Sequence, residues 1–72
     1  MFIYFKYRLK EVYLDIDPNM PFKIVLGELK EKYDWMNDIN IKYLSFNGAE
    51  INLNLSCIQI GIPSDSKILI VE

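Results

Sequence analysis

The 72-residue sequence contains no histidine and only one cysteine, Cys57. Without histidine, the chain cannot assemble a Ser-His-Asp triad, a Cys-His pair or an HExxH zinc site, and it lacks the commonest general base. A single cysteine cannot form an internal disulfide and cannot hold structural zinc without other ligands. These absences predict that the protein is not an enzyme, that it binds no cofactor or metal, and that it resides in a reducing, cytoplasmic compartment.

Long apolar runs and an excess of positive charge are also missing. No run approaches the ~20 residues of a membrane span, and the N-terminal segment lacks the layout of a signal peptide. Eight Lys+Arg against ten Asp+Glu give a net charge of −2, which gives no electrostatic reason to bind nucleic acid. We therefore expect neither a membrane nor a nucleic acid as a partner.

The sequence is instead rich in stiff apolar side chains. Hydrophobic residues make up 51% of the chain and eleven residues are isoleucine, whereas glycine and proline number three each. β-Branched side chains favour strands. The length fits one domain over residues 1–72, either a small protein or a piece of a longer one.

Alternation of apolar and polar residues predicts strands near both ends of the chain. Residues 1–8 alternate, and residues 12–17 do so again after a polar turn at residues 9–11, so these segments are expected to form an antiparallel hairpin. Residues 67–71 form the last strand. The positions predicted to face the core from the sheet are Ile3, Phe5, Leu14, Ile16, Leu44, Phe46, Ile68 and Ile70.

The middle of the chain combines a helix with a second hairpin. Residues 21–33 predict a helix with one apolar stripe. The members of that stripe are Phe22, Val25, Leu26, Leu29 and Tyr33. Residues 41–46 predict a strand, Asn47-Gly48 is the strongest hairpin signal in the chain, and residues 49–51 form a short returning strand. Residues 52–62 show no clear period and predict a loop or a short 3₁₀ turn packed on the core.

This order of elements, ββαββ, predicts the α+β fold class. A helix that follows a hairpin covers one face of the sheet, and a right-handed crossover leads to a strand beside the first pair. The last strand is the most apolar, so we expect it in the sheet centre and parallel to the first strand. A mixed sheet of four to five strands with one helix packed across it is a β-grasp.

Five segments, taken in order, resemble those of ubiquitin: Met1-Phe2-Ile3-Tyr4-Phe5-Lys6, Val12-x-Leu14-x-Ile16-x-Pro18, Phe22-x-x-Val25-x-x-x-Leu29, Tyr43-Leu44-Ser45-Phe46-Asn47-Gly48 and Gly61-Ile62-Pro63-Ser64-Asp65-Ser66-Lys67-Ile68-Leu69-Ile70-Val71. They are similar to its first strand, its second strand and closing proline, the inward face of its helix, its third strand with the following turn, and its closing turn with the last strand. The resemblance runs from end to end and implies a ubiquitin-like (β-grasp) protein.

The C-terminal residues depart from this family. Ubiquitin-like modifiers end in a flexible Gly-Gly tail, whereas this sequence stops at Val71-Glu72. We therefore expect a non-conjugated interaction domain. Two alternatives are a ubiquitin-type modifier whose Gly-Gly tail is missing from the sequence given, and a small accessory protein similar to the ubiquitin-like components of bacterial secretion systems. The full open reading frame distinguishes the three.

The family's recognition patch is also altered. Its central isoleucine corresponds to Ser45, and the neighbouring basic positions correspond to Tyr43 and Ala49. The resemblance therefore implies that general ubiquitin receptors bind this chain poorly.

Aromatic side chains supply the best candidate for a binding site. If Ile3 and Phe5 face the helix, alternation sends a second set of side chains to the outer side of the sheet. The predicted partner-binding residues are Phe2, Tyr4, Lys6, Tyr13, Tyr43, Ser45, Leu69 and Val71. Tyr and Phe are enriched at interfaces, so the expected partner is a protein or a second copy of the chain. The alternative is that these aromatics only support cross-strand pairing.

Three other features have structural interpretations. Cys57 lies among apolar residues and is expected to be a buried, inert thiol. Trp35 and Met36, in a connector over residues 34–40, are expected to plug the core. Alternation at Lys6, Arg8 and Lys10 predicts three cations on one strand face, as edge protection or as contacts for an acidic partner.

Overall fold

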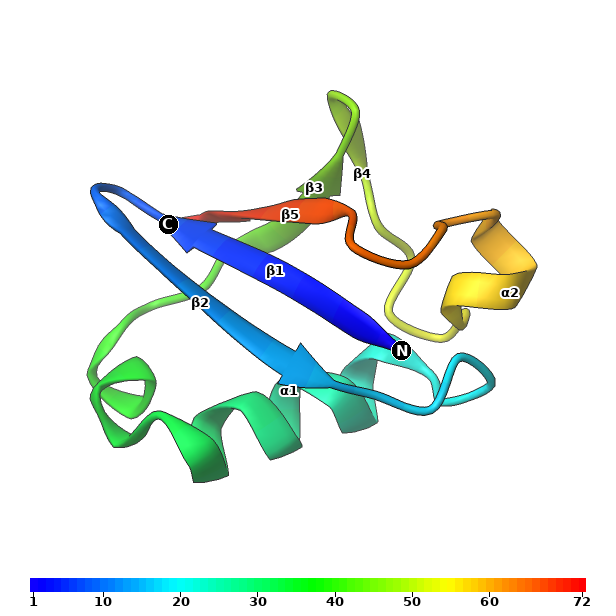
Figure 1. Ribbon diagram of the computed structural model, residues 1–72. Coiled ribbons are helices and arrows are strands. Elements are labelled where there is room, and N and C mark those ends of the chain that lie inside the picture. Colours follow the sequence, from blue (N-terminus) through cyan, green and yellow to red (C-terminus); the bar gives the residue numbers. More distant parts are fainter.

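The computed structural model describes residues 1–72 and places one main helix across one face of a five-stranded sheet (Figure 1). In chain order, the elements are β1 (Phe2–Tyr7), β2 (Lys10–Asp15), α1 (Phe22–Lys32), a 3₁₀ helix η1 (Asp34–Asp38), β3 (Tyr43–Phe46), β4 (Ala49–Glu50), α2 (Cys57–Ile60) and β5 (Lys67–Val71). None of the helices is both long enough and apolar enough to cross a membrane.

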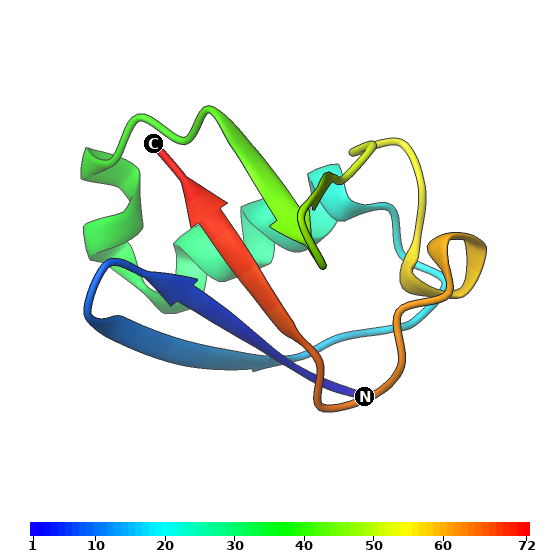
Figure 2. The ribbon, with the colours of Figure 1, turned by 90° about the horizontal axis from the view of Figure 1, so that it is seen from above.

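The strand order is β2-β1-β5-β3-β4, with β5 in the centre (Figure 2). β5 runs parallel to β1 and antiparallel to β3, and the two hairpins are antiparallel. The α+β class, the mixed sheet, the central last strand and the helix across one face are therefore confirmed, and their arrangement is that of a β-grasp.

The first hairpin turns earlier than the sequence predicted. Tyr7 pairs with Lys10, so the loop consists of Arg8 and Leu9 rather than residues 9–11, and β2 begins at Lys10. Arg8 takes a left-handed backbone conformation with φ of 54°, which is uncommon for a residue with a side chain. A two-residue hairpin loop commonly needs such a residue, but neither Arg nor Leu signals it.

The helix α1 begins one residue after the predicted start and ends one residue before the predicted end. Pro21 is its N-cap and provides no side-chain hydrogen bond. Instead, the N–H groups of Phe22 and Lys23 donate to the carbonyl oxygens of Leu55 and Leu53, at 3.0 Å each. The loop before α2 therefore satisfies donors that a helix start leaves free.

The core lies between α1 and the facing side of the sheet. Its buried hydrophobic residues are Ile3, Phe5, Leu14, Ile16, Phe22, Val25, Leu29, Met36, Leu44, Ile51, Cys57, Ile62, Ile68 and Ile70. Seven of the eight inward sheet positions predicted from alternation are in this set, and the eighth, Phe46, is only partly buried. Phe46 ends β3 and lines a hollow beside β4, so part of its ring is open to solvent.

The segment before β5 contains a short α-helix where a loop or 3₁₀ turn was predicted. α2 begins after Ser56, whose Oγ accepts a hydrogen bond from the Gln59 N–H while the Gln59 side chain accepts one from the Ser56 N–H. This is a complete capping box. Gly61 ends the helix in a left-handed conformation, φ 90°.

The connector after α1 contributes to the core through Met36, which is fully buried in η1. Trp35 is half-buried, and its ring packs 5.9 Å from the ring of Tyr7. The Lys10 ammonium lies 4.3 Å from the Trp35 ring centroid. Met36 is therefore the plug predicted from sequence, whereas Trp35 closes the edge of the core beneath the first hairpin.

The end of β5 is tied to the first hairpin by Glu72. Its carboxylate accepts a hydrogen bond from the Tyr7 hydroxyl at 2.8 Å and pairs with the Arg8 guanidinium at 2.5 Å. The Tyr7 hydrogen bond and then the Arg8 contact lower the pKa of Glu72. Arg8 and Glu72 are exposed and Tyr7 is only partly buried, so we expect the contact to contribute little to the stability of the whole fold.

This contact predicts a pH dependence of stability. The pKa of Glu72 in the folded state lies below its unfolded value of about 4.3. The contribution of Glu72 to the free energy of unfolding is therefore fully present above pH ~4.3, and it is lost as the pH falls through the folded-state pKa. Glu72→Gln should therefore lower the urea midpoint at pH 7, and its difference from the parent should shrink toward pH 3. Glu31→Gln, on exposed α1 surface without an ion pair, is the control. A difference that stays constant with pH contradicts this role.

Candidate interaction surface

The outer face of the sheet is the side opposite α1, and no helix covers it (Figure 1). Ile3, Phe5, Ile68 and Ile70 point to the core, so the residues between them in β1 and β5 point outward. Strand pairing then fixes the neighbours of these outward side chains on β2 and β3. All eight residues predicted from the sequence lie on this face: Phe2, Tyr4, Lys6, Tyr13, Tyr43, Ser45, Leu69 and Val71.

Register arranges these residues in rows across the sheet. One row runs from Tyr13 through Tyr4 to Lys67, and a second runs from Lys6 through Leu69 to Ser45. A third pairs Val71 with Tyr43. Residues directly opposite each other on neighbouring strands share a face and touch, so the eight residues form one continuous surface.

The half of this surface over β1 and β2 is aromatic. The rings of Phe2 and Tyr13 meet edge to face at 5.9 Å between centroids, and those of Tyr4 and Tyr13 are tilted at 6.4 Å. Phe2 is 46% exposed, Tyr13 49% and Leu69 47%. Cross-strand aromatic pairing therefore does occur here. About half of Phe2, Tyr13 and Leu69 nevertheless stays in contact with water, and stabilising the pairing of the strands does not require so much exposed apolar surface.

Charges of both signs surround the apolar residues. Lys6 is exposed and forms no ion pair, although it lies opposite Glu11. Glu11 instead contacts Lys67, with 3.3 Å between Oε2 and Nζ. Asp15, opposite Phe2, accepts a hydrogen bond from the N-terminal amino group of Met1 at 2.7 Å. Of the two strand cations on this face, Lys6 and Lys67, only Lys6 is without an ion pair.

The predicted row of three cations does not exist. Lys6 is on the outer face, Arg8 is in the turn and pairs with Glu72, and Lys10 pairs with Tyr7 and covers Trp35. The prediction failed because the two-residue turn places Arg8 outside the strands and returns Lys10 on the next strand, so the alternation does not continue through the hairpin.

Other surface features were not anticipated from the sequence. Leu9, at the tip of the first hairpin, is fully exposed. Glu11 and Lys67 belong to the outer face, and period two could have placed both of them there. A hollow beside β4 is lined mainly by apolar side chains, and it arises from the packing of the loop before α2, which no periodicity reveals.

Cys57 is buried, with 1% of its surface exposed. Burial raises the pKa of its thiol, so the thiolate needed by a nucleophile is disfavoured. The prediction of a buried cysteine is confirmed.

No protein-family model and no curated protein matches this chain.

Proposed function

We propose that the protein is a non-catalytic ubiquitin-like interaction domain that binds a protein partner through the outer face of its sheet. The observation that carries this role is the set of half-exposed apolar side chains, Phe2, Tyr13 and Leu69, on a face that no helix covers. Contiguous apolar surface bordered by charge is typical of protein interfaces.

The ubiquitin-like family is supported by the order of its five similar segments and by a β-grasp arrangement with the central β1–β5 pair. Ser45 lies next to Leu69 on the outer face and is half-buried. A partner that covers this hydroxyl must offer it a hydrogen bond, which general ubiquitin receptors, built for an isoleucine, do not provide. The partner is therefore a dedicated one, and a second copy remains within the proposal.

The absence of histidine and the burial of Cys57 support a role without catalysis. A single cysteine that forms no disulfide supports a reducing, cytoplasmic location. The net charge of −2 supports a protein partner rather than nucleic acid.

The double change Tyr4→Ser, Leu69→Ser tests this role. Both side chains face away from the core, so the free energy of unfolding should stay within about 1 kcal/mol of the parent. At least one protein that the parent captures from the source cells, and any self-association seen by sedimentation, should be lost because the apolar centre of the face is gone.

The matched control is Ile24→Ser, Ile58→Ser, which removes two apolar side chains that are 49% and 60% exposed outside the outer face. This control should retain every interaction of the parent. If the double variant on the outer face folds and binds like the parent, the aromatic residues serve strand pairing alone.

A further inference from the structure

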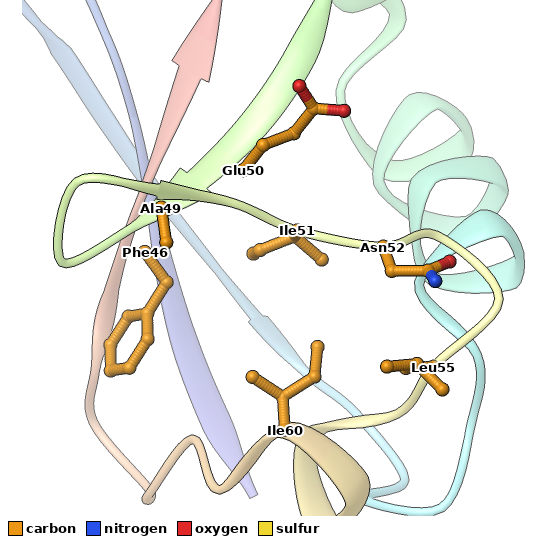
Figure 3. Close-up of a pocket in the computed structure, with 7 residues that line it drawn as sticks. All are labelled: Phe46, Ala49, Glu50, Ile51, Asn52, Leu55 and Ile60. Atoms are coloured by element: carbon orange, nitrogen blue, oxygen red, sulfur yellow. The ribbon is translucent and has the colours of Figure 1, made fainter.

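A hollow of about 260 Å³ lies between the β3–β4 hairpin and α2 (Figure 3). The apolar side chains that line it are those of Phe46, Ala49, Ile51, Leu55 and Ile60. In Figure 3, the Phe46 and Ala49 side chains on one side and Ile60 on the other point toward the space between them. The hollow is smaller than the roughly 300–1,000 Å³ of small-molecule sites, and an apolar side chain suits it better.

The rim of this hollow is the free edge of β4. Phe46 pairs with Ala49 across the two-residue turn, and the Ile51 N–H donates to the Leu44 carbonyl oxygen at 2.8 Å. Between these two hydrogen-bonded pairs, Ser45 and Glu50 form a non-hydrogen-bonded pair, so the N–H and C=O of Glu50 point away from β3. They face the open edge, and neither has a partner outside the sheet.

The opposite edge of the sheet, at β2, is covered by side chains of α1 and the residue that follows it, whereas the β4 edge is not. At β2, the Tyr33 hydroxyl donates to the outward carbonyl oxygen of Tyr13 at 2.8 Å, and the Lys32 ammonium lies 4.4 Å from the Tyr13 ring centroid. Edge strands are commonly blocked against added strands in this manner. No side chain hydrogen bonds to the β4 edge in the same way.

Glu50 adds a charge to this edge. It is exposed, forms no ion pair, and shares the outer face with Ser45. In Figure 3 its carboxylate points to the side of β4 away from Ile60 and Leu55. Side chains of a strand added here would alternate, so the residue opposite Glu50 would lie on the outer face while its two neighbours point toward the hollow.

We propose that the β4 edge and the adjoining hollow bind an extended segment of a partner protein that carries a basic residue between two aliphatic ones. The backbone of the segment hydrogen bonds to the N–H and C=O of Glu50, its Lys or Arg pairs with the Glu50 carboxylate, and its aliphatic side chains enter the hollow against Phe46 and Ile60. Main-chain hydrogen bonds and alternate side-chain pockets together define strand addition.

This edge is a second binding site, distinct from the aromatic residues of the outer face. Its occupancy does not depend on Tyr4 or Leu69. The double variant Tyr4→Ser, Leu69→Ser should therefore bind the segment as the parent does, and failure of one site is distinguishable from failure of the other.

The test uses two end-blocked peptides, Thr-Leu-Lys-Leu-Thr and Thr-Leu-Glu-Leu-Thr, titrated into the isotope-labelled protein while amide resonances are followed. The lysine peptide should shift the amide resonances of residues 49–52, Phe46 and Ile60. It should also bind roughly three- to tenfold more tightly than the glutamate peptide, because its lysine gains an exposed ion pair with Glu50, whereas the glutamate is repelled by Glu50. Glu50→Lys should reverse this preference. Glu31→Lys makes the same charge change on α1 and should leave it intact.

Equal affinities for the two peptides, no shifts at residues 49–52, or shifts confined to Tyr4 and Leu69 would each overturn the proposal. If Glu50→Lys does not fold, the affinities of the two peptides for the parent protein still test the proposal. A dimer that sedimentation detects for the parent but not for Glu50→Lys would make the occupant a second copy and would likewise overturn the assignment to a partner segment.

Discussion

Replacing Leu29 with Ala should lower the free energy of unfolding by about 2–5 kcal/mol. Leu29 is fully buried in the last part of α1, within the cluster that joins the helix to the sheet. Removing three carbon atoms there forfeits their transfer free energy and leaves a cavity that the surrounding side chains cannot fill completely. Since small domains have only about 5–15 kcal/mol of stability in total, the variant should be close to unfolding. Urea denaturation at pH 7 measures the loss.

The matched control is Ile24→Ala on the same helix. Ile24 is 49% exposed, so a truncation of equal size should change stability by no more than about 0.5 kcal/mol. A loss of less than 1 kcal/mol for Leu29→Ala, or equal losses for the two variants, would show that α1 does not pack on the sheet through this face.

Thiol labelling of Cys57 should be roughly a thousandfold slower in the native protein than in denaturant. The side chain is 1% exposed, so the reagent must wait for an opening, and about 4 kcal/mol of opening free energy corresponds to that factor. Burial also raises the pKa of the thiol, so fewer thiolates are present to react. Timed labelling with a chromogenic disulfide reagent measures both rates.

The control is the double variant Cys57→Ser, Ser64→Cys, which moves the thiol to an exposed turn and should be labelled at nearly the same rate with and without denaturant. Native Cys57 that reacts as fast as this exposed thiol would contradict its structural role and would make Cys57 a candidate nucleophile.

Periodicity in the sequence was sufficient to predict the sheet and α1. The stripe that includes Val25 and Leu29 repeats at helical spacing, and Ile68 and Ile70 alternate with exposed residues, so one face of each element had to be buried. The apolar character of the last strand led correctly to its central position beside β1. The common orientation of the eight outer residues followed from the same alternation.

Short elements and loop packing were less predictable. α2 spans only Cys57–Ile60, too few residues for a helical period, and its sequence signals were the capping pair Ser56 and Gln59 and the closing Gly61. The turn at Arg8 lacks the residues that usually mark positive φ. The hollow beside β4 depends on where the loop before α2 rests against α1, a tertiary contact that no local pattern encodes.

The parallel pairing of β1 with β5 also governs the order in which the chain can fold. The first hairpin joins segments adjacent in sequence, whereas the central pair, such as Phe5 with Ile68, joins segments near opposite ends of the chain. Contacts of long sequence separation require the closure of a long loop before they contribute, and they slow folding. During synthesis, the first hairpin and α1 can form while the inner edge of β1 stays open until β5 leaves the ribosome. Until then, that edge is open to pairing with other strands.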